Sequence, residues 1–147
     1  FADSLHGYIA GFGAIYKTID GGSSWSFTDA KNDYFTATEW FSNTEGIAIG
    51  WEGTILRTEN GGESWERIRN GNNATQKKIR LKGLAQNNDF GLVAVGEKGC
   101  MIYSKDRGRT WDEFEDFTNA NLEAVSFKDN DTFFAVGADG RIFKVQF

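Results

Sequence analysis

The sequence predicts an all-β protein built from a unit that recurs along its 147 residues. A short block ending in tryptophan occurs three times, and short apolar segments with strand-like alternation separate the blocks. Glycine is frequent, with 18 residues, whereas proline is absent. Since Gly, Asn and Asp tolerate positive φ angles, we expect these residues to form the tight turns between the predicted strands.

The recurring block has a constant order of residue types: a hydroxyl residue, an acid or amide, a glycine, a second hydroxyl residue and a tryptophan. Its members are Thr18, Asp20, Gly22, Ser24 and Trp25, then Thr58, Asn60, Gly62, Ser64 and Trp65, and then Ser104, Asp106, Gly108, Thr110 and Trp111. The tryptophans lie 40 and 46 residues apart. A repeat of this length is typical of the blades of a β-propeller.

Each unit contains four short segments that strand periodicity identifies. The first segments are apolar and cover residues 35–41, 79–85 and 122–127. The second segments are small and apolar and end in glycine, at residues 7–11, 46–50, 91–96 and 132–137. The third segments cover residues 14–18, 54–58, 100–104 and 141–145, and a fourth carries Trp25, Trp65 or Trp111. Four antiparallel strands in each unit of about 40 residues make one propeller blade.

The predicted architecture is a single partial β-propeller domain over residues 1–147, with three nearly complete blades and three strands of a fourth. The blades cover about residues 1–30, 31–72, 73–118 and 119–147. Exposed strand edges pair with other chains, so open edges on the first and last blades favour self-association. Two explanations remain open: the chain is the C-terminal half of a larger propeller, for example a seven-bladed one, or two copies close a ring.

The block residues suit a tight turn between two outer strands. We expect Asp20 and Asp106 to accept hydrogen bonds from amides two residues on, and Asn60 to do so through its carbonyl. The glycine two residues after each supplies a positive φ, and each tryptophan covers its hairpin. A calcium loop would require alternating ligands and a distal glutamate, which are missing. We therefore expect a structural block, with no metal and no cofactor.

The block resembles the Asp-box, or bacterial neuraminidase repeat, whose pattern is Ser/Thr-x-Asp-x-Gly-x-Thr/Ser-Trp. The stretch from Gly46 to Trp65 resembles the photosystem II stability and assembly factor family. This resemblance implies a propeller with a basic surface that binds a membrane-protein precursor, and it favours an extracytoplasmic location. Related boxes occur in sialidases, xyloglucanases and sortilin-type receptors, so the box by itself indicates a fold rather than an activity.

Candidate partner-binding residues lie on the predicted face that carries the turns between second and third strands. Trp51 occupies such a turn between glycines, where a large ring can serve as a contact residue. The segment of residues 67–82 carries six cations and no acid, which leaves a net charge of −11 on the rest of the chain. Such segregation can steer an acidic partner, although a solvated loop has the same composition. The candidates are Trp51, Arg67, Arg69, Lys77, Lys78 and Arg80.

The sequence contains no recognisable catalytic set. A sialidase would need an arginine triad and a tyrosine nucleophile within a full ring. Other glycosidases need two neighbouring carboxylates, but among 21 acids such pairs arise by chance. The net charge of −5 disfavours nucleic acid, and no apolar run approaches the ~20 residues that span a membrane. We therefore predict a non-catalytic protein-binding or assembly scaffold. The alternatives are a carbohydrate-active propeller fragment, either a hydrolase or lectin-like, and a structural module of a larger extracellular or viral assembly.

Overall fold

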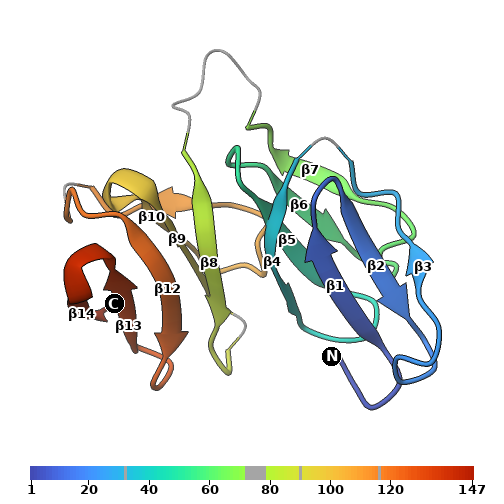
Figure 1. The fold of residues 1–147 in the computed structure, drawn as a ribbon. Coiled ribbons are helices and arrows are strands. Elements are labelled where there is room, and N and C mark those ends of the chain that lie inside the picture. Colours follow the sequence, from blue (N-terminus) through green and yellow to red (C-terminus); the bar gives the residue numbers. More distant parts are fainter. Residues whose placement is uncertain (32, 72–78, 90, 116) are drawn as a thin grey trace.

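The computed structural model describes residues 1–31, 33–71, 79–89, 91–115 and 117–147. In these residues, 14 strands form four antiparallel sheets. The sheets follow one another in chain order, with the first and the last at opposite sides of the molecule (Figure 1). This arrangement confirms the predicted all-β class and the partial propeller.

The two end sheets have three strands each. The first sheet consists of β1 (Gly7–Gly11), β2 (Ala14–Thr18) and β3 (Ser26–Phe27). The last consists of β12 (Leu122–Phe127), β13 (Thr132–Gly137) and β14 (Ile142–Gln146). Within the repeat, the first sheet lacks the inner strand and the last sheet lacks the outer strand.

The two middle sheets have the four strands expected of a complete blade. The second sheet consists of β4 (Phe35–Trp40), β5 (Gly46–Gly50), β6 (Ile55–Thr58) and β7 (Glu66–Arg69). The third consists of β8 (Leu81–Gln86), β9 (Leu92–Gly96), β10 (Met101–Ser104) and β11 (Asp112–Glu113). Short 3₁₀ turns, η1 (Glu97–Gly99) and η2 (Ala138–Gly140), join the second and third strands of the last two sheets.

Most strand bounds coincide with the predicted ones, and the others differ by one or two residues. The largest shift concerns β8, which was predicted from residue 79 and begins at Leu81. The fourth strands were predicted to carry the tryptophans, yet each begins one residue later. Trp25 and Trp111 belong to the turn because their indole N–H groups donate to the carbonyls of Gly22 and Gly108.

The core consists of three apolar clusters, each of which lies between two successive sheets. Side chains alternate along every strand, so one set of residues faces the preceding sheet and the other faces the following sheet. On β5, Ala48 packs towards the first sheet, whereas Ile47 and Ile49 pack towards the third. The sheets therefore pack face to face through the same kind of apolar contact at each junction.

The Asp-box of the first sheet closes its turn with side-chain hydrogen bonds. The Thr18 hydroxyl donates to Asp20 Oδ1 at 2.7 Å and accepts from the Gly22 amide at 2.9 Å. Asp20 Oδ1 also accepts from the Ser24 amide at 2.8 Å. The expectation that the acid accepts from the amide two residues on was therefore wrong. The Thr18 hydroxyl accepts from the amides of Asp20 and Gly22, so the Asp20 carboxylate accepts from the amide of Ser24, four residues on.

The other two boxes repeat this pattern. Asn60 accepts from the Ser64 amide at 2.9 Å through its carbonyl, and its amide donates to the Ser64 hydroxyl at 2.8 Å. The box glycines take positive φ angles of 94°, 81° and 78° at Gly22, Gly62 and Gly108. The side-chain carbonyl of Asn60 thus makes the same acceptor bond as the carboxylate of Asp20.

Candidate functional site

The three inner strands share one irregularity, a β-bulge directly after their first residue. The pairing register shifts between Phe35 and Ala37 on β4, between Leu81 and Gly83 on β8, and between Leu122 and Ala124 on β12. The extra residues are Thr36, Lys82 and Glu123. Because a bulge leaves one residue unpaired and redirects its side chain, the same position is re-aimed in three successive sheets.

These three residues meet in a hollow of about 520 Å³ to which all four sheets contribute, here named the central depression. Its lining residues are Ala10, Gly11, Tyr34, Phe35, Thr36, Trp51, Lys82 and Glu123. The depression lies where the inner strands begin, on the face that carries the turns between second and third strands. Ligand sites in propellers and other concave folds favour such convergent positions.

The charged groups of the central depression are paired with one another. Lys82 Nζ lies 2.7 Å from Glu123 Oε1 and 4.0 Å from Glu97 Oε1, and Arg80 Nη1 lies 3.5 Å from the same Glu97 oxygen. The Lys82 side chain is 17% exposed, whereas that of Glu123 is 48% exposed. The depression therefore offers both a cation and an anion to a ligand at hydrogen-bonding range.

Trp51 forms the aromatic wall of the central depression. The Arg80 guanidinium carbon lies 5.2 Å from the indole centroid, and Lys82 Nζ lies 5.7 Å from it. Both distances are within the range of a cation–π contact. The Tyr34 ring meets the indole edge to face at 6.4 Å between centroids. The cations keep the indole oriented towards the depression.

The turn that presents Trp51 is held from below by a buried acid. The Asp33 carboxylate accepts from the amides of Glu52 at 3.0 Å and Thr54 at 3.3 Å, and it is 8% exposed. The Trp51 amide itself donates to the Tyr34 carbonyl at 2.7 Å. These bonds order the turn before any ligand arrives, which reduces the conformational entropy that binding would cost.

The structure divides the candidate residues predicted from the sequence into separate groups. Trp51 lines the central depression, and Arg80 lies against its ring without lining the depression itself. Arg67 and Arg69 lie on the outer strand β7, where they donate to the carbonyls of Lys31 and Gly53. Burial lowers the pKa of the Arg69 guanidinium, which lies against the turn that contains Gly53. Lys77 and Lys78 lie outside the described residues.

Sequence reasoning missed Tyr34, Thr36 and Glu123 as members of this site, and it treated Lys82 only as part of a basic segment. A signal was present at the second position of each inner strand. There, a polar residue stands between an apolar and a small residue: Phe-Thr-Ala, Leu-Lys-Gly and Leu-Glu-Ala. An alternating strand tolerates this pattern without a bulge, so the signal is visible only when the repeats are superposed.

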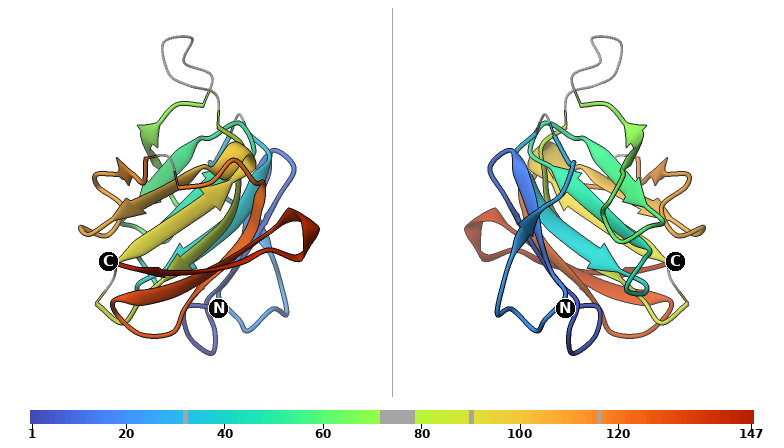
Figure 2. Two further views of the ribbon diagram at one scale, coloured as in Figure 1. Left: turned by 90° about the vertical axis from the view of Figure 1, so that its left-hand side faces the viewer. Right: turned by 90° about the vertical axis from the view of Figure 1, so that its right-hand side faces the viewer.

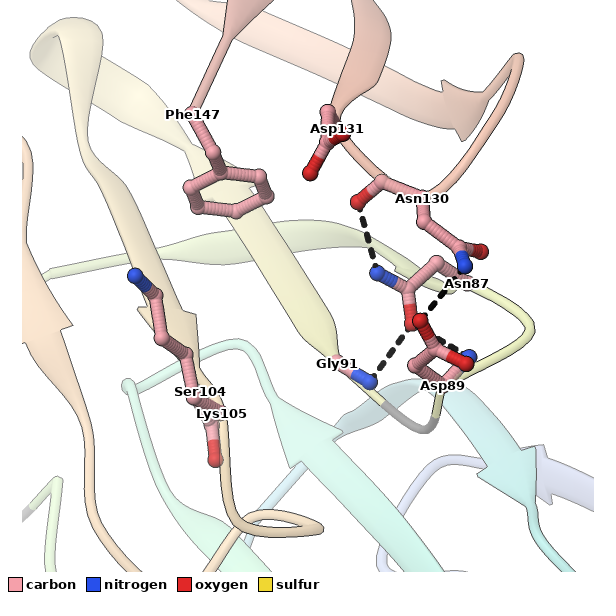
Figure 3. Close-up of a pocket in the computed structure, with 8 residues that line it drawn as sticks. All are labelled: Asn87, Asp89, Gly91, Ser104, Lys105, Asn130, Asp131 and Phe147. Carbon is pink, nitrogen blue, oxygen red and sulfur yellow. Dashed lines mark hydrogen bonds between the residues drawn. The ribbon is translucent and has the colours of Figure 1, made fainter.

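A second hollow of about 240 Å³ lies between the third and fourth sheets (Figure 3). Asn87 donates to the Asn130 carbonyl at 2.9 Å and accepts from the Gly91 amide at 2.7 Å. Phe147 and Lys105 lie on the other side of the hollow. Because Asn87 and Asp89 of one hairpin bond to Asn130 of the next, this hollow is a junction between two hairpins.

Two further observations concern the part of the chain that the structure describes. No group of three or more His, Cys, Asp and Glu side chains is placed to hold a metal ion. None of the described helices has the length and apolar character that a membrane span requires.

The fold and its turns define a class, the Asp-box β-propellers. Within that class, the family model described as photosynthesis system II assembly factor YCF48 matches residues 1–75 and 70–146. The chain belongs to this family. No curated protein sequence matches it.

Solved structures show the same fold at low sequence identity. YCF48 bound to D1 peptide is 21% identical with a TM-score of 0.71, and the match covers 94% of this chain and 45% of that one. YCF48 from Cyanidioschyzon merolae is 17% identical with a TM-score of 0.65, covering 90% and 45%. An ancestral GH74 enzyme is 14% identical with a TM-score of 0.77, covering 98% and 21%. The chain thus spans about half the length of the YCF48 structures it matches.

Proposed function

We propose that this chain is a non-catalytic scaffold that binds a segment of a protein partner in the central depression. The observation that carries the proposal is the convergence of the bulge residues Thr36, Lys82 and Glu123 beside Trp51. Family membership supports it, since a YCF48 protein has been solved in complex with a D1 peptide.

The chemistry of the central depression suits an extended peptide. Trp51 offers a rigid apolar surface that loses little conformational entropy on binding, and tryptophan is enriched among the residues that dominate binding energy. Lys82 and Glu123 supply a donor and an acceptor side by side, and a peptide backbone carries both C=O acceptors and N–H donors. The hollow is open and is lined from four sheets, so a chain segment has room to cross it.

A scaffold role fits the way in which the acids of this face are used. Glu97 and Glu123 both lie next to Lys82, which binds the two carboxylates as an ion-pair partner. The competing hypothesis is carbohydrate binding or hydrolysis, which the likeness to the GH74 enzyme favours at the level of the fold. The two hypotheses predict different ligands for the same depression.

Titration of a labelled D1 peptide, followed by fluorescence anisotropy, tests the proposal. The wild-type chain should bind, and Trp51→Ala and Lys82→Ala should each weaken the Kd by at least about tenfold, because they remove the aromatic wall and the central cation. Trp51→Phe should retain part of the affinity. Lys105→Ala is the matched control, since Lys105 also lies over aromatic rings but borders the second hollow.

Three outcomes would contradict the proposal. The first is a wild-type chain that does not bind the peptide. The second is an equal loss of affinity for Lys82→Ala and Lys105→Ala, which would indicate general electrostatic attraction. The third is hydrolysis of a glycoside panel that is abolished by Glu123→Gln, which would establish the carbohydrate hypothesis instead.

A further inference from the structure

Three aromatic side chains follow one another across the face that carries the turns between second and third strands. They are here named the aromatic row and consist of Phe12, Tyr34 and Trp51. The Phe12 and Tyr34 rings meet edge to face at 5.7 Å between their centroids, and the Tyr34 and Trp51 rings at 6.4 Å. Phe12 is 85% exposed and Tyr34 is 49% exposed. Exposed apolar surface that is contiguous in this way marks an interaction site.

Backbone bonds fix the position of each ring in the aromatic row. Phe12 forms a β-bridge with Tyr34, and the next amide, that of Gly13, donates to the Asp33 carbonyl at 3.0 Å. On the other side, the Trp51 amide donates to the Tyr34 carbonyl. Tyr34 therefore lies between the β1–β2 turn and the β5–β6 turn, which are at the end of their sheets opposite the N-terminus (Figure 2). Its ring is thus exposed towards this face although a described sheet flanks it on either side.

The aromatic row continues the central depression over the first sheet. Tyr34 and Trp51 line the depression, whereas Phe12 lies outside it on the β1–β2 turn. A partner segment that is held at Trp51 and extends towards the first sheet therefore passes over the Tyr34 and Phe12 rings. Because the positions of these rings are fixed before binding, contact with them costs this chain little conformational entropy.

The spacing of the rings matches the repeat of an extended peptide. In an extended chain each residue advances about 3.3 Å and successive side chains point to opposite sides, so alternate side chains lie about 6.6 Å apart on one side. The ring centroids are 5.7 and 6.4 Å apart, so alternate side chains of such a segment can each meet one ring. The rings are inclined at 76° and 60° to one another, so they offer no common plane on which a flat sugar chain could stack.

We propose that the aromatic row selects partner segments in which large apolar side chains stand at every second position. The inference rests on the proposed function: the central depression holds one part of the segment, and the aromatic row receives the adjoining part in an extended conformation. Trp51 and Tyr34 contact the apolar side chains nearest the depression, and Phe12 contacts the last one. Phe12 is thus a specificity-determining residue that lies outside the depression.

Fluorescence anisotropy with two labelled synthetic peptides of equal length and composition tests this inference. The alternating peptide has leucine at every second position between serines, and the block peptide has the same leucines side by side. The wild-type chain should bind the alternating peptide at least about tenfold more tightly. Phe12→Ser should reduce this preference at least about threefold and leave binding of the block peptide unchanged, whereas Phe12→Leu should retain most of the preference. An unchanged affinity of Phe12→Ser for the block peptide also shows that the variant is folded.

Phe27→Ser is the matched control for Phe12→Ser. Phe27 is 56% exposed and meets Tyr16 edge to face at 5.8 Å, as Phe12 meets Tyr34, but it lies on the outer strand β3. Its substitution should leave both affinities unchanged, because the partner segment does not reach the outer strand.

Four outcomes would overturn the inference. Equal affinities of the wild type for the two peptides, or equal losses for Phe12→Ser and Phe27→Ser, would do so. Binding of the D1 peptide that Trp51→Ala weakens would then leave the proposed function intact, so the two failures are distinguishable. A wild-type chain that binds none of the peptides would overturn the inference and the proposed function together. Displacement of the alternating peptide by a xyloglucan oligosaccharide would assign the aromatic row to carbohydrate instead.

Discussion

At the residue scale, the Asp-box shows how a carboxylate and an amide serve one turn. Hydrogen bonds from the Ser24 hydroxyl and amide, with a further bond from Thr18, lower the pKa of Asp20 to about 2. Asn60 makes the same acceptor bond without a charge. The turn therefore needs an acceptor at this position, and only the aspartate version is sensitive to acid.

The acid sensitivity of Asp20 is testable by thermal unfolding between pH 2 and pH 5. The pKa of Asp20 is about 2 in the folded chain and about 3.9 in an unfolded one. Its contribution to stability is therefore complete above about pH 4 and is lost as the pH falls towards 2. Between pH 5 and pH 2, the Tm of Asp20→Asn should fall by less than that of the wild type, and the Tm of Asn60→Asp should fall by more. Parallel Tm curves for all three proteins would contradict this explanation.

At the element scale, the third Asp-box differs from the other two at its first turn position. Gly21 and Gly61 occupy this position with φ angles of 70° and 67°, whereas the third box has Arg107 at 59°. Arg107 reaches Glu45 on the preceding sheet at 2.9 Å, and its carbonyl accepts from the buried Arg57 at 3.2 Å. Bonds between the sheets thus hold Arg107 in a backbone conformation that glycine adopts without strain.

The strain at Arg107 is measured by comparing two substitutions in urea denaturation. Arg107→Gly and Arg107→Ala both remove the guanidinium that contacts Glu45, but only alanine keeps a Cβ at positive φ. Arg107→Gly should therefore be more stable than Arg107→Ala by about 1 kcal/mol. Gly13→Ala provides a control, because its φ is 67° and its new Cβ would meet no atom within 4 Å. It should cost a similar amount, and no cost in either comparison would exclude strain at these turns.

At the scale of the whole molecule, stability comes from the faces between successive sheets. The apolar clusters join strands of neighbouring sheets, and two box tryptophans add to these contacts. The same residue type thus has two environments: Trp65 packs against the preceding sheet, whereas Trp25 is 36% exposed on the first sheet. Equal local turns do not imply equal contributions to stability.

This difference predicts unequal costs for two identical substitutions. Trp65→Ala should lower the free energy of unfolding by about 3 kcal/mol, because it opens a cavity in the cluster between the first two sheets. Trp25→Ala should cost less than half of that. Both are measured by urea denaturation. Equal costs would indicate that each tryptophan acts on its own hairpin alone.

The site was only partly predictable. Trp51 and Arg80 were identified because a ring on a glycine-flanked turn and a cation in a basic segment are local features. Glu123 and Thr36 were missed, because a bulge is a property of strand pairing and not of the strand's own residues. Arg67 and Arg69 were included because they lie near Arg80 along the chain, although they belong to the outer strand.

Local chemistry in the chain is sufficient for the units of this fold. The order of hydroxyl, acid or amide, glycine and tryptophan specifies each turn, and the alternation of apolar residues specifies which strand faces are buried, because both depend on neighbours within a few residues. The convergence of Thr36, Lys82 and Glu123 depends instead on the rotation between sheets and on three bulges in register. These arise only when the apolar clusters pack, since that packing sets how each sheet lies on the next.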